Sequence, residues 1–563
     1  MRTSAAYLIV LVFFFLCYGM TSPEYIGDTT RYAGDVIGHA QGLKTQFWEF
    51  GHLLWRPWGY VGYSLLGDRY AQWFSDSPAQ IVDRVLIQTN LICSAVTLLV
   101  MLSLLRRVTG IWVAGAIVIS MSCSISFLNY SHSGAPYVPA LLFSALTVLL
   151  LTMAAEDPPA GRSYALLAGI SFAIACALWF PYAFTGLGMV AALYFWPSRD
   201  SAGMSEKRKL GLQLVGSFLL ALAASALLLF AAGAVAKGIG NVSQLRQWIL
   251  ESDDEWSQSK RLMRAVTGVP RSVWDLGGDT ILLKRWLFSD PYNPVGISTL
   301  VFSLGGKLVT FYLGIGAALW VLWKERRAML FILAAAGLPL LLFAIILFEP
   351  SSPERFLPVF PFAYLAFALV LDRGRHYVVP SALILILLAG TTVVNLAGKT
   401  STGASFTKTT ERIHALNSNV QPGAVVTVVT MADDLYALPN ANPLNKSLTP
   451  SGFRVADAVV IASRTILRWR AAFAVRALEQ WAQNKEMWFS ERLLALKPEA
   501  HWLWVEGDDP RIRWPELPSA FGQLETDLKI EAGGDGFLRV AQTQANRVLL
   551  AKWAAAIEDQ PAH

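Results

Sequence analysis

Residues 163–196 read SYALLAGISFAIACALWFPYAFTGLGMVAALYFW, an apolar stretch that Pro181 interrupts. A bilayer core roughly 30 Å thick is crossed by about 20 apolar residues in a helix. The stretch is therefore long enough for one extended span, and it also divides into two short ones, 163–179 and 182–196. The choice decides on which side of a membrane every later segment lies.

Clusters of Lys and Arg between the apolar segments identify the inside loops, because cytoplasmic loops are enriched in these residues. The clusters are Arg106 with Arg107, Arg199 with Lys207, Arg208 and Lys209, Lys324 with Arg326 and Arg327, and Arg373 with Arg375. Between the first two clusters the chain must cross the membrane an even number of times. Two spans in 163–196 satisfy this condition and one does not, so we predict two.

Apolar segments of this kind recur up to Asn395 and are almost missing after it. The chain of 563 residues is 54% hydrophobic and 15% charged, which is unlike a set of soluble domains. We expect an all-α polytopic membrane domain of about 11 transmembrane helices. The predicted spans are 5–20, 84–105, 110–128, 136–154, 163–179, 182–196, 210–235, 297–323, 328–348, 356–371 and 377–395. We interpret 5–20 as an uncleaved first span, because no clear small-x-small cleavage site flanks it.

The predicted topology divides the chain into two domains. With Arg2 inside, the long loops 21–83 and 236–296 lie outside, as does everything after 396. We therefore expect a transmembrane domain, 1–396, and an extracytoplasmic soluble domain, 397–563. In the tail, GAVVTVVT, VADAVVIAS and HWLWVEG are predicted strands, and TERIHALNSNV and 467–498 are predicted helices. This alternation indicates a small α/β domain.

Net charge and cysteine content indicate which kinds of partner and cofactor to expect. The net charge of +6 comes largely from inter-helix loops, so we expect a lipid bilayer and no nucleic acid as a partner. The four cysteines, Cys17, Cys93, Cys123 and Cys176, lie in apolar segments without metal-ligand spacing. We interpret them as packing residues. We predict no cofactor and no metal site, and leave a divalent cation open.

The first outside loop begins with PEYIGDTTRYAGD, residues 23–35. Asp28 stands just past the first span, within reach of the membrane surface. If 29–42 is helical, Asp28 is a good N-cap residue. A carboxylate at this depth is also a candidate general base. The sequence leaves both interpretations open.

The same loop continues with FWEFGHLLWRPWGY, residues 47–60. Aromatic residues at a bilayer surface commonly form an interfacial belt. The combination of Trp55 and Trp58 with His52 and Arg56 also suits a sugar or a polyprenyl phosphate, with rings for stacking and a guanidinium for phosphate. A single histidine is more often structural than catalytic, so the role of His52 stays open.

Residues 349–358, EPSSPERFLP, place Arg355 in a short outside loop where a span begins. An outside arginine runs against the positive-inside bias, so either its side chain snorkels or it binds the phosphate of a lipid. Lys307, on the same outer half, could serve the same anion. Asp253, Asp254, Glu255 and Trp256 could bind an acceptor or a cation, although a solvated acidic face is the simpler interpretation.

These three stretches resemble the GT-C superfamily of polyprenyl-phosphate-sugar-dependent glycosyltransferases, in particular protein O-mannosyltransferases and aminoarabinose transferases. Residues 28–33, DTTRYA, resemble that family's Asp-Glu-x-x-Tyr-Ala, with Thr29 in place of the glutamate. Residues 52–57, HLLWRP, are similar to its later loop motif, and residues 353–358, PERFLP, to its late arginine segment.

The resemblance implies an inverting transfer of a sugar from a polyprenyl-phosphate-linked donor to an acceptor hydroxyl on the extracytoplasmic face. Asp28 would be the general base. Arg355, with Lys307 or Arg56, would bind the donor phosphate. The substrate-binding candidates are Arg31, Tyr32, His52, Trp55 and Trp58. The acceptor would be a protein, a lipid or a polysaccharide, and the location a bacterial inner membrane.

Two other classes of protein remain as alternatives. A transporter or lipid flippase tends to show internal repeats and polar groups near the midplane. We find no repeat, and the polar candidates gather at the outer surface, which favours an enzyme. A catalytically inactive membrane scaffold is the other alternative, and Thr29 in place of an acid is the feature that supports it.

Overall fold

The computed structural model describes residues 2–21, 28–43, 45–74, 78–195, 204–250, 261–276, 286, 295–346 and 352–397. Beyond these it describes 425–426, 429–430, 454–455, 459–460, 474, 478, 481–482, 488–490, 528–532 and 537–555. By internal contacts the chain forms two compact units. One consists of Met1–Leu65, Arg84–Gly278 and Phe302–Ser401, and the other of Leu66–Asp83, Asp279–Val301 and Thr402–His563.

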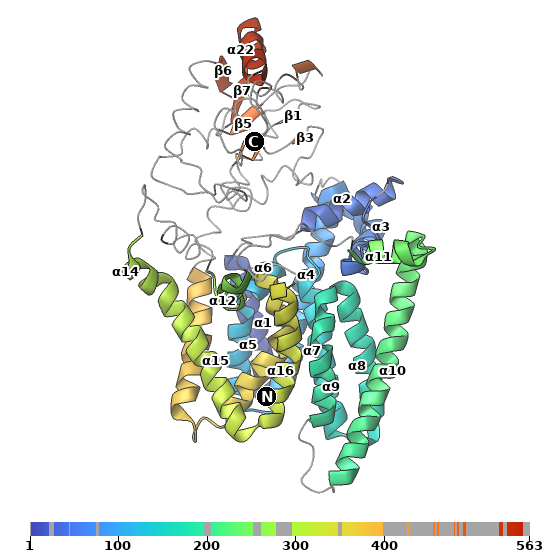
Figure 1. Cartoon of the computed structure of the whole chain (residues 1–563), viewed down its shortest axis with the longest axis vertical. Helices are drawn as coiled ribbons and strands as arrows, with labels where there is room; N and C mark the ends of the chain where they lie inside the picture. The colour runs from blue at the N-terminus through green and yellow to red at the C-terminus, as the bar shows by residue number, and fades with distance from the viewer. Residues whose placement is uncertain are drawn as a thin grey trace. The chain divides into compact units, whose positions relative to one another are not determined.

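The described amino-terminal half consists mainly of helices (Figure 1). They are α1 (Arg2–Met20), α2 (Thr29–Ala40), η1 (Phe50–His52), α3 (Trp55–Phe74), α4 (Pro78–Leu105), α5 (Ile111–Ser122), α6 (Ile125–Ser131), α7 (Tyr137–Glu156), α8 (Pro158–Leu178), η2 (Phe180–Thr185) and α9 (Gly186–Phe195). Then come α10 (Met204–Lys237), α11 (Val242–Leu250), α12 (Arg261–Arg271), α14 (Ile297–Leu300), the π-helical turn η3 (Val301–Gly305), α15 (Gly306–Glu325), α16 (Arg327–Ile346), η4 (Pro353–Val359), α17 (Phe360–Asp372) and a helix at Val378–Ala397.

Within the described residues, nine helices are long and apolar enough to cross a membrane. The bent pair α5 and α6 makes a tenth if it counts as one span, and the apolar helix Phe180–Phe195 is shorter. The protein is therefore an integral, multi-pass membrane protein. Each of the 11 predicted segments corresponds to one of these helices, bent pairs or shorter helices.

The apolar stretch 163–196 folds into two antiparallel segments, as the charge pattern predicts. Gly161, at the start of α8, packs beside Leu214 of α10. Gly211, one turn earlier in α10, packs beside Leu193 near the end of α9. The start of α8 and the end of α9 thus lie at the same end of α10. Pro181 sits in the 3-10 turn η2 that reverses the chain between them.

The predicted span 110–128 is wrong as a single straight helix. The chain bends by 68° between α5 and α6. Two backbone amides at the start of α6 donate to carbonyls outside the helix: Ile125 N to Val273 O at 3.0 Å, and Ser126 N to Ser272 O at 3.3 Å. Asn395 Nδ2 donates to the carbonyl of Cys123 at 2.7 Å. These bonds satisfy the backbone groups that a break inside a membrane leaves open.

Glycines allow the helices of the bundle to approach closely. Figure 1 shows α7, α8, α9 and α10 side by side, and these helices contact one another. A Cβ on Gly169 of α8 would lie 2.5 Å from the carbonyl oxygen of Phe218 in α10. A Cβ on Gly188 of α9 would lie 2.5 Å from the Cβ of Ala336 in α16. Small residues at such contacts are how membrane helices pack backbone against backbone.

The described part of the carboxy-terminal unit contains short paired strands. β1 (Val425–Val426) pairs in parallel with β3 (Arg454–Val455), and β2 (Val429–Thr430) with β4 (Val459–Val460). β7 (Phe537–Val540) lies between β5 (Trp488–Ser490) and β6 (Ile530–Ala532), antiparallel to both, and α22 spans Gln544–Ala555. The predicted strand HWLWVEG and the predicted helix TERIHALNSNV lie outside the described residues.

Candidate functional site

Asp28 directly precedes α2 and occupies its N-cap position, but its carboxylate makes no capping hydrogen bond. One helical turn further along, the hydroxyl of Tyr32 approaches Asp28 Oδ2 at 3.5 Å. Residues four apart share a face of a helix, so the start of α2 holds the two groups together. The carboxylate is thus directed along the face of α2 that carries Tyr32.

His52 and Glu49, both from the short helix η1 and its N-cap, extend this set of polar groups beyond Tyr32. The Tyr32 hydroxyl lies 3.4 Å from His52 Nε2. On the other side of the imidazole ring, Nδ1 lies 3.2 Å from Glu49 Oε2. Glu49 is the N-cap residue of η1 and His52 is the last residue of that turn. The short helix therefore presents a carboxylate and an imidazole together toward α2.

Arg56 is a fully buried cation in contact with this group. Its guanidinium donates to Glu49 Oε2 at 2.5 Å and to Asp35 Oδ2 at 2.7 Å. It also lies 4.7 Å from the centre of the Tyr32 ring. A buried charge is tolerated only when it is paired and hydrogen-bonded. Arg56 thus joins α2, η1 and α3, and its role toward a donor phosphate stays a prediction.

The charges of the cluster fix its protonation states. Burial alone would raise the pKa of Glu49, but His52 and Arg56 outweigh burial and hold that pKa well below its usual range. Burial, together with the charges of Asp28 and Glu49, raises the pKa of Tyr32 well above that of a free phenol. At neutral pH Glu49 is therefore a carboxylate, and Tyr32 keeps its hydroxyl proton.

A second polar group is built on η4, which carries Arg355. Glu354 is buried and accepts a hydrogen bond from the Tyr130 hydroxyl at 2.5 Å. The Arg355 guanidinium lies 3.6 Å from Glu354 Oε1 and 6.0 Å from the centre of the Trp179 ring. The Arg355 side chain is 15% exposed, so it keeps access to the surface that the fully buried Arg56 lacks.

Tyr137, the first residue of α7, stands between the two groups. Its ring contacts Tyr130 edge-to-face at 4.8 Å and Trp179 at 4.5 Å, and lies 6.4 Å from the His52 ring. Both Asp28 and Glu354 act on it electrostatically. The structure therefore brings the start of α2 and the start of η4 to the same end of the bundle, around one aromatic residue.

Two of the predicted loop residues serve as structural anchors. The indole N–H of Trp55 donates to the carbonyl of Gly134 at 2.7 Å, and Thr29 Oγ1 accepts from the amide of Gly134 at 2.8 Å. Both side chains are buried. A Cβ on Gly134 would lie 2.6 Å from Thr29 and 2.9 Å from Leu86, so only glycine fits. Trp55 therefore has a structural role in this loop, and a contact with substrate stays a prediction.

The other predicted residues bond to partners outside this group. Trp58 is half exposed, and its N–H bonds to Thr89 Oγ1 at 3.0 Å. The guanidinium of Arg31 donates to Gln46 Oε1. Lys307 Nζ bonds to the carbonyl of Asp275 at 3.2 Å. The residues that lie outside the described part are Glu24, Asp253, Asp254, Glu255 and Trp256.

Sequence reasoning missed the partners that hold the candidates in place. These are Asp35, Glu49, Tyr130, Tyr137, Trp179 and Glu354. A spacing signal was present for one of them, Asp35. Asp28, Tyr32 and Asp35 are four and three residues apart, which places them on one face of a helix. No comparable signal marks the aromatic residues, because they come from distant segments.

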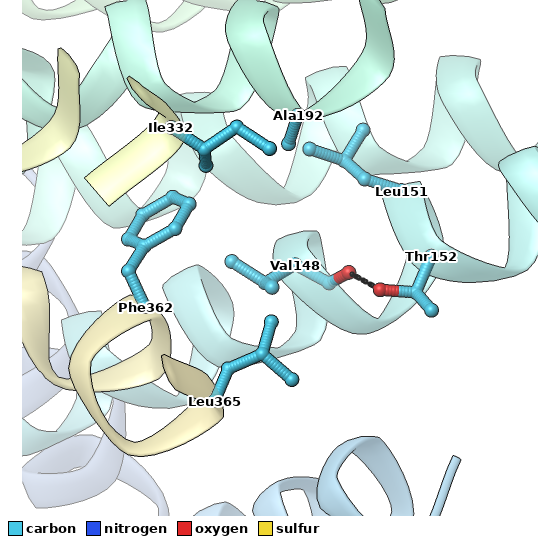
Figure 2. A pocket seen from close by; sticks show the side chains of 7 residues that line it. All are labelled: Val148, Leu151, Thr152, Ala192, Ile332, Phe362 and Leu365. Atoms are coloured by element: carbon cyan, nitrogen blue, oxygen red, sulfur yellow. Dashed lines mark hydrogen bonds between the residues drawn. The ribbon is translucent and has the colours of Figure 1, made fainter. Parts of the chain in front are cut away.

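Neither a metal cluster nor a polar cavity stands out elsewhere in the part of the chain that the structure describes. Within those residues no group of three or more His, Cys, Asp or Glu side chains could hold a metal ion. Figure 2 shows a cavity between α7, α9, α16 and α17 with a largely apolar lining. It has no room for a water molecule, and its one hydroxyl, Thr152 Oγ1, is bonded to the carbonyl of Val148. We assign it no chemistry.

No protein-family model matches the sequence, and no curated protein does. Solved structures share its fold. The structure of ArnT from Cupriavidus metallidurans bound to undecaprenyl phosphate superimposes with a TM-score of 0.51 at 12% identity, covering 96% of this chain and 98% of ArnT. Apo ArnT gives 0.49 at 13% identity over the same shares, and the oligosaccharyltransferase of Archaeoglobus fulgidus gives 0.47 at 12% over 96% and 74%. At this level of identity the likeness shows that the chain has the fold of ArnT.

A stability measurement tests the role of Arg56. We expect Arg56→Met to cost about 3–5 kcal/mol of folding free energy, because it leaves two buried carboxylates without their cation. Arg31→Met removes an exposed arginine three residues after Asp28 and should change stability by less than about 0.5 kcal/mol. Denaturation of both variants in one detergent measures the difference. An Arg56→Met variant as stable as Arg31→Met would show that Arg56 does not hold the cluster.

Proposed function

We propose that this GT-C protein is an inverting membrane glycosyltransferase, which moves a sugar from a polyprenyl-phosphate-linked donor to an acceptor hydroxyl on the extracytoplasmic face. The observation that carries the proposal is the position of Asp28. Asp28 follows the first membrane helix, and its carboxylate adjoins the group formed by Tyr32, His52 and Glu49. Tyr137 interacts electrostatically both with Asp28 and with Glu354, the neighbour of Arg355. The undecaprenyl phosphate bound by ArnT, which has the same fold, supports a lipid-phosphate donor.

Asp28 is the general base of the proposed reaction. As the acceptor oxygen attacks the anomeric carbon, its proton passes to the Asp28 carboxylate. The bond between that carbon and the phosphate oxygen breaks on the opposite face, and its electron pair leaves with the phosphate. The configuration at the carbon is inverted. Tyr32 positions the base, since its hydroxyl lies beside Asp28 Oδ2.

Arg355 is the proposed ligand of the leaving phosphate, on which negative charge grows in the transition state. The Arg355 side chain is partly exposed, and its guanidinium lies near the carboxylate of Glu354 and the ring of Trp179. Lys307 is a second candidate cation. Arg56 has the different role of fixing Glu49 and Asp35, and through its contact with the Tyr32 ring it also fixes the position of that residue.

The surface residues are suited to the other parts of the substrates. Trp58 exposes half of its side chain and offers a ring face for a sugar or a lipid. Arg31 lies exposed beside Asp28 in the sequence, where an acceptor would approach. The acceptor is a protein, a lipid or a polysaccharide. We also propose that 397–563 is a soluble α/β domain on the same side of a bacterial inner membrane, supported by the paired strands β1 to β7.

The orientation is tested with a reporter. The charge pattern places the carboxy terminus outside the cytoplasm. A reporter that works only in the cytoplasm should therefore stay silent when fused after His563, and should be active when fused within 199–207. A bright signal at the carboxy terminus would reverse the topology.

Donor binding tests Arg355. A charge-assisted hydrogen bond to phosphate contributes about 1.5–3 kcal/mol, so Arg355→Ala should weaken binding of undecaprenyl phosphate by roughly tenfold or more. Arg373→Ala, at an arginine after the end of α17, is the matched control and should bind normally. Equal affinity of the parent protein and Arg355→Ala would remove Arg355 from the site.

Asp28→Asn tests the base. The variant keeps the size of the side chain but cannot accept a proton. We expect normal stability and undecaprenyl phosphate binding, with transfer reduced by about 10²–10⁴-fold. Release of undecaprenyl phosphate from a panel of undecaprenyl-phosphate-linked sugars measures transfer whichever sugar is moved.

The matched control for Asp28→Asn is Asp68→Asn, at an exposed carboxylate of α3, which should retain full activity. Asp35 is unsuitable as a control because it pairs with Arg56. Transfer by Asp28→Asn within a few-fold of the parent protein would end the assignment of Asp28 as the base.

A further inference from the structure

A chain of polar groups leads away from Asp28, and the proposed transfer step uses only its first member. The Tyr32 hydroxyl lies 3.5 Å from Asp28 Oδ2 and 3.4 Å from His52 Nε2. His52 Nδ1 lies 3.2 Å from Glu49 Oε2. The hydroxyl therefore bridges the carboxylate and the imidazole, and Glu49 supports the imidazole from behind. Distances of this length in an empty site commonly shorten when substrate binds.

The state of Glu49 decides which nitrogen of His52 carries the proton. Glu49 is ionised, and a carboxylate only accepts hydrogen bonds. Nδ1 of His52 therefore carries a hydrogen and donates it to Glu49. In the neutral ring, Nε2 is then an acceptor, and it faces the hydroxyl of Tyr32. His52 is thus oriented to receive a proton from the side on which Asp28 lies.

We propose that His52 receives, through the Tyr32 hydroxyl, the proton that Asp28 takes from the acceptor. This inference rests on the proposed function. The Asp28 O–H bond breaks toward the Tyr32 oxygen while the Tyr32 proton moves to His52 Nε2. Asp28 is then a carboxylate again, Tyr32 a hydroxyl again, and His52 an imidazolium paired with Glu49. The imidazolium releases its proton to water, because 13% of the side chain is exposed.

The direction of this transfer follows from the surroundings of His52. The imidazolium that forms is paired with the Glu49 carboxylate, so transfer from Asp28 toward His52 is favourable. The raised pKa of Tyr32 keeps its oxygen protonated at rest. Tyr32 therefore passes one proton on as it receives another, and no free phenolate is needed. The Asp28 carboxylate is restored by this relay.

The charges around His52 come from each element packed against it. Glu49 of η1 favours the imidazolium, and Arg56 of α3 limits this effect because it pairs with the same carboxylate oxygen. Tyr32 of α2 and Tyr137 of α7 add neutral hydroxyl-bearing rings. This balance suits a residue that must both gain and release a proton. His52 and Tyr32 act through Asp28 and are positioning residues for the reaction.

The connection is tested first in the resting protein. The full chain contains seven histidines, and with nitrogen-15-labelled histidine the signal of His52 is the one that His52→Gln removes. Asp28→Asn takes away a negative charge at the far side of the hydroxyl, so the nitrogen-15 signals of His52 should shift. Tyr32→Phe keeps the ring over Arg56 and should shift the Nε2 signal. Unchanged His52 signals in both variants, as expected for Asp68→Asn, would overturn the proposal.

The transfer itself is tested by its pH profile, again with release of undecaprenyl phosphate. In the parent protein, kcat should rise with pH as the imidazole of His52 loses its proton. His52→Gln should lower kcat by about 10²-fold, flatten this rise and leave the KM for the donor unchanged, and Tyr32→Phe should do the same. A His52→Gln variant that keeps both the rate and the rise would overturn the relay. Loss of transfer in Asp28→Asn would still support the base, so the two proposals fail separately.

Discussion

The site depends on one buried ion group, the guanidinium of Arg56 between Glu49 and Asp35. Taking a cation fully out of water is costly, and its attraction to carboxylates offsets that cost only in good geometry. Here the geometry requires three elements at once, because Asp35 lies on α2, Glu49 caps η1 and Arg56 lies on α3. The loop after the first membrane helix is therefore fixed by charge pairing as well as by apolar packing. Because these ion pairs fix α2, they also fix the positions of Asp28 and Tyr32 at its start.

A second constraint ties this loop to the membrane bundle. The helix α6 follows the bend and leads to Gly134, whose amide and carbonyl bond to Thr29 and Trp55. The carbonyl of Ala177, near the end of α8, accepts the amide of Leu54. The loop therefore forms hydrogen bonds with backbone groups at the ends of the membrane helices, and these bonds hold it in place. A straight helix over 110–128 would not offer these partners.

The sequence predicts the membrane architecture well, because span length, apolar character and the placement of basic residues are local properties. The two antiparallel segments in 163–196 follow from the requirement that the chain cross the membrane an even number of times between two inside loops. The bend at Cys123 does not follow, since it depends on carbonyls more than 140 residues away in the chain. Likewise, Asp28, Tyr32, His52 and Arg56 can be recognised from residues 28–60, but the sequence does not show that Arg56 faces inward. Its partners belong to separate elements, and only the folded chain brings them together.

Thr29 shows how the fold limits the chemistry. The resemblance to the GT-C enzymes places a second acid at this position, but here the side chain is buried against Gly134 and accepts its amide. A longer carboxylate there would crowd Gly134, in a buried place where an ionised group is costly unless it is paired. A second proton acceptor must therefore come from another element. His52 meets that requirement, because η1 places its imidazole one hydroxyl away from Asp28. Residues 47–60 thus contribute to the proposed chemistry as well as to the membrane surface.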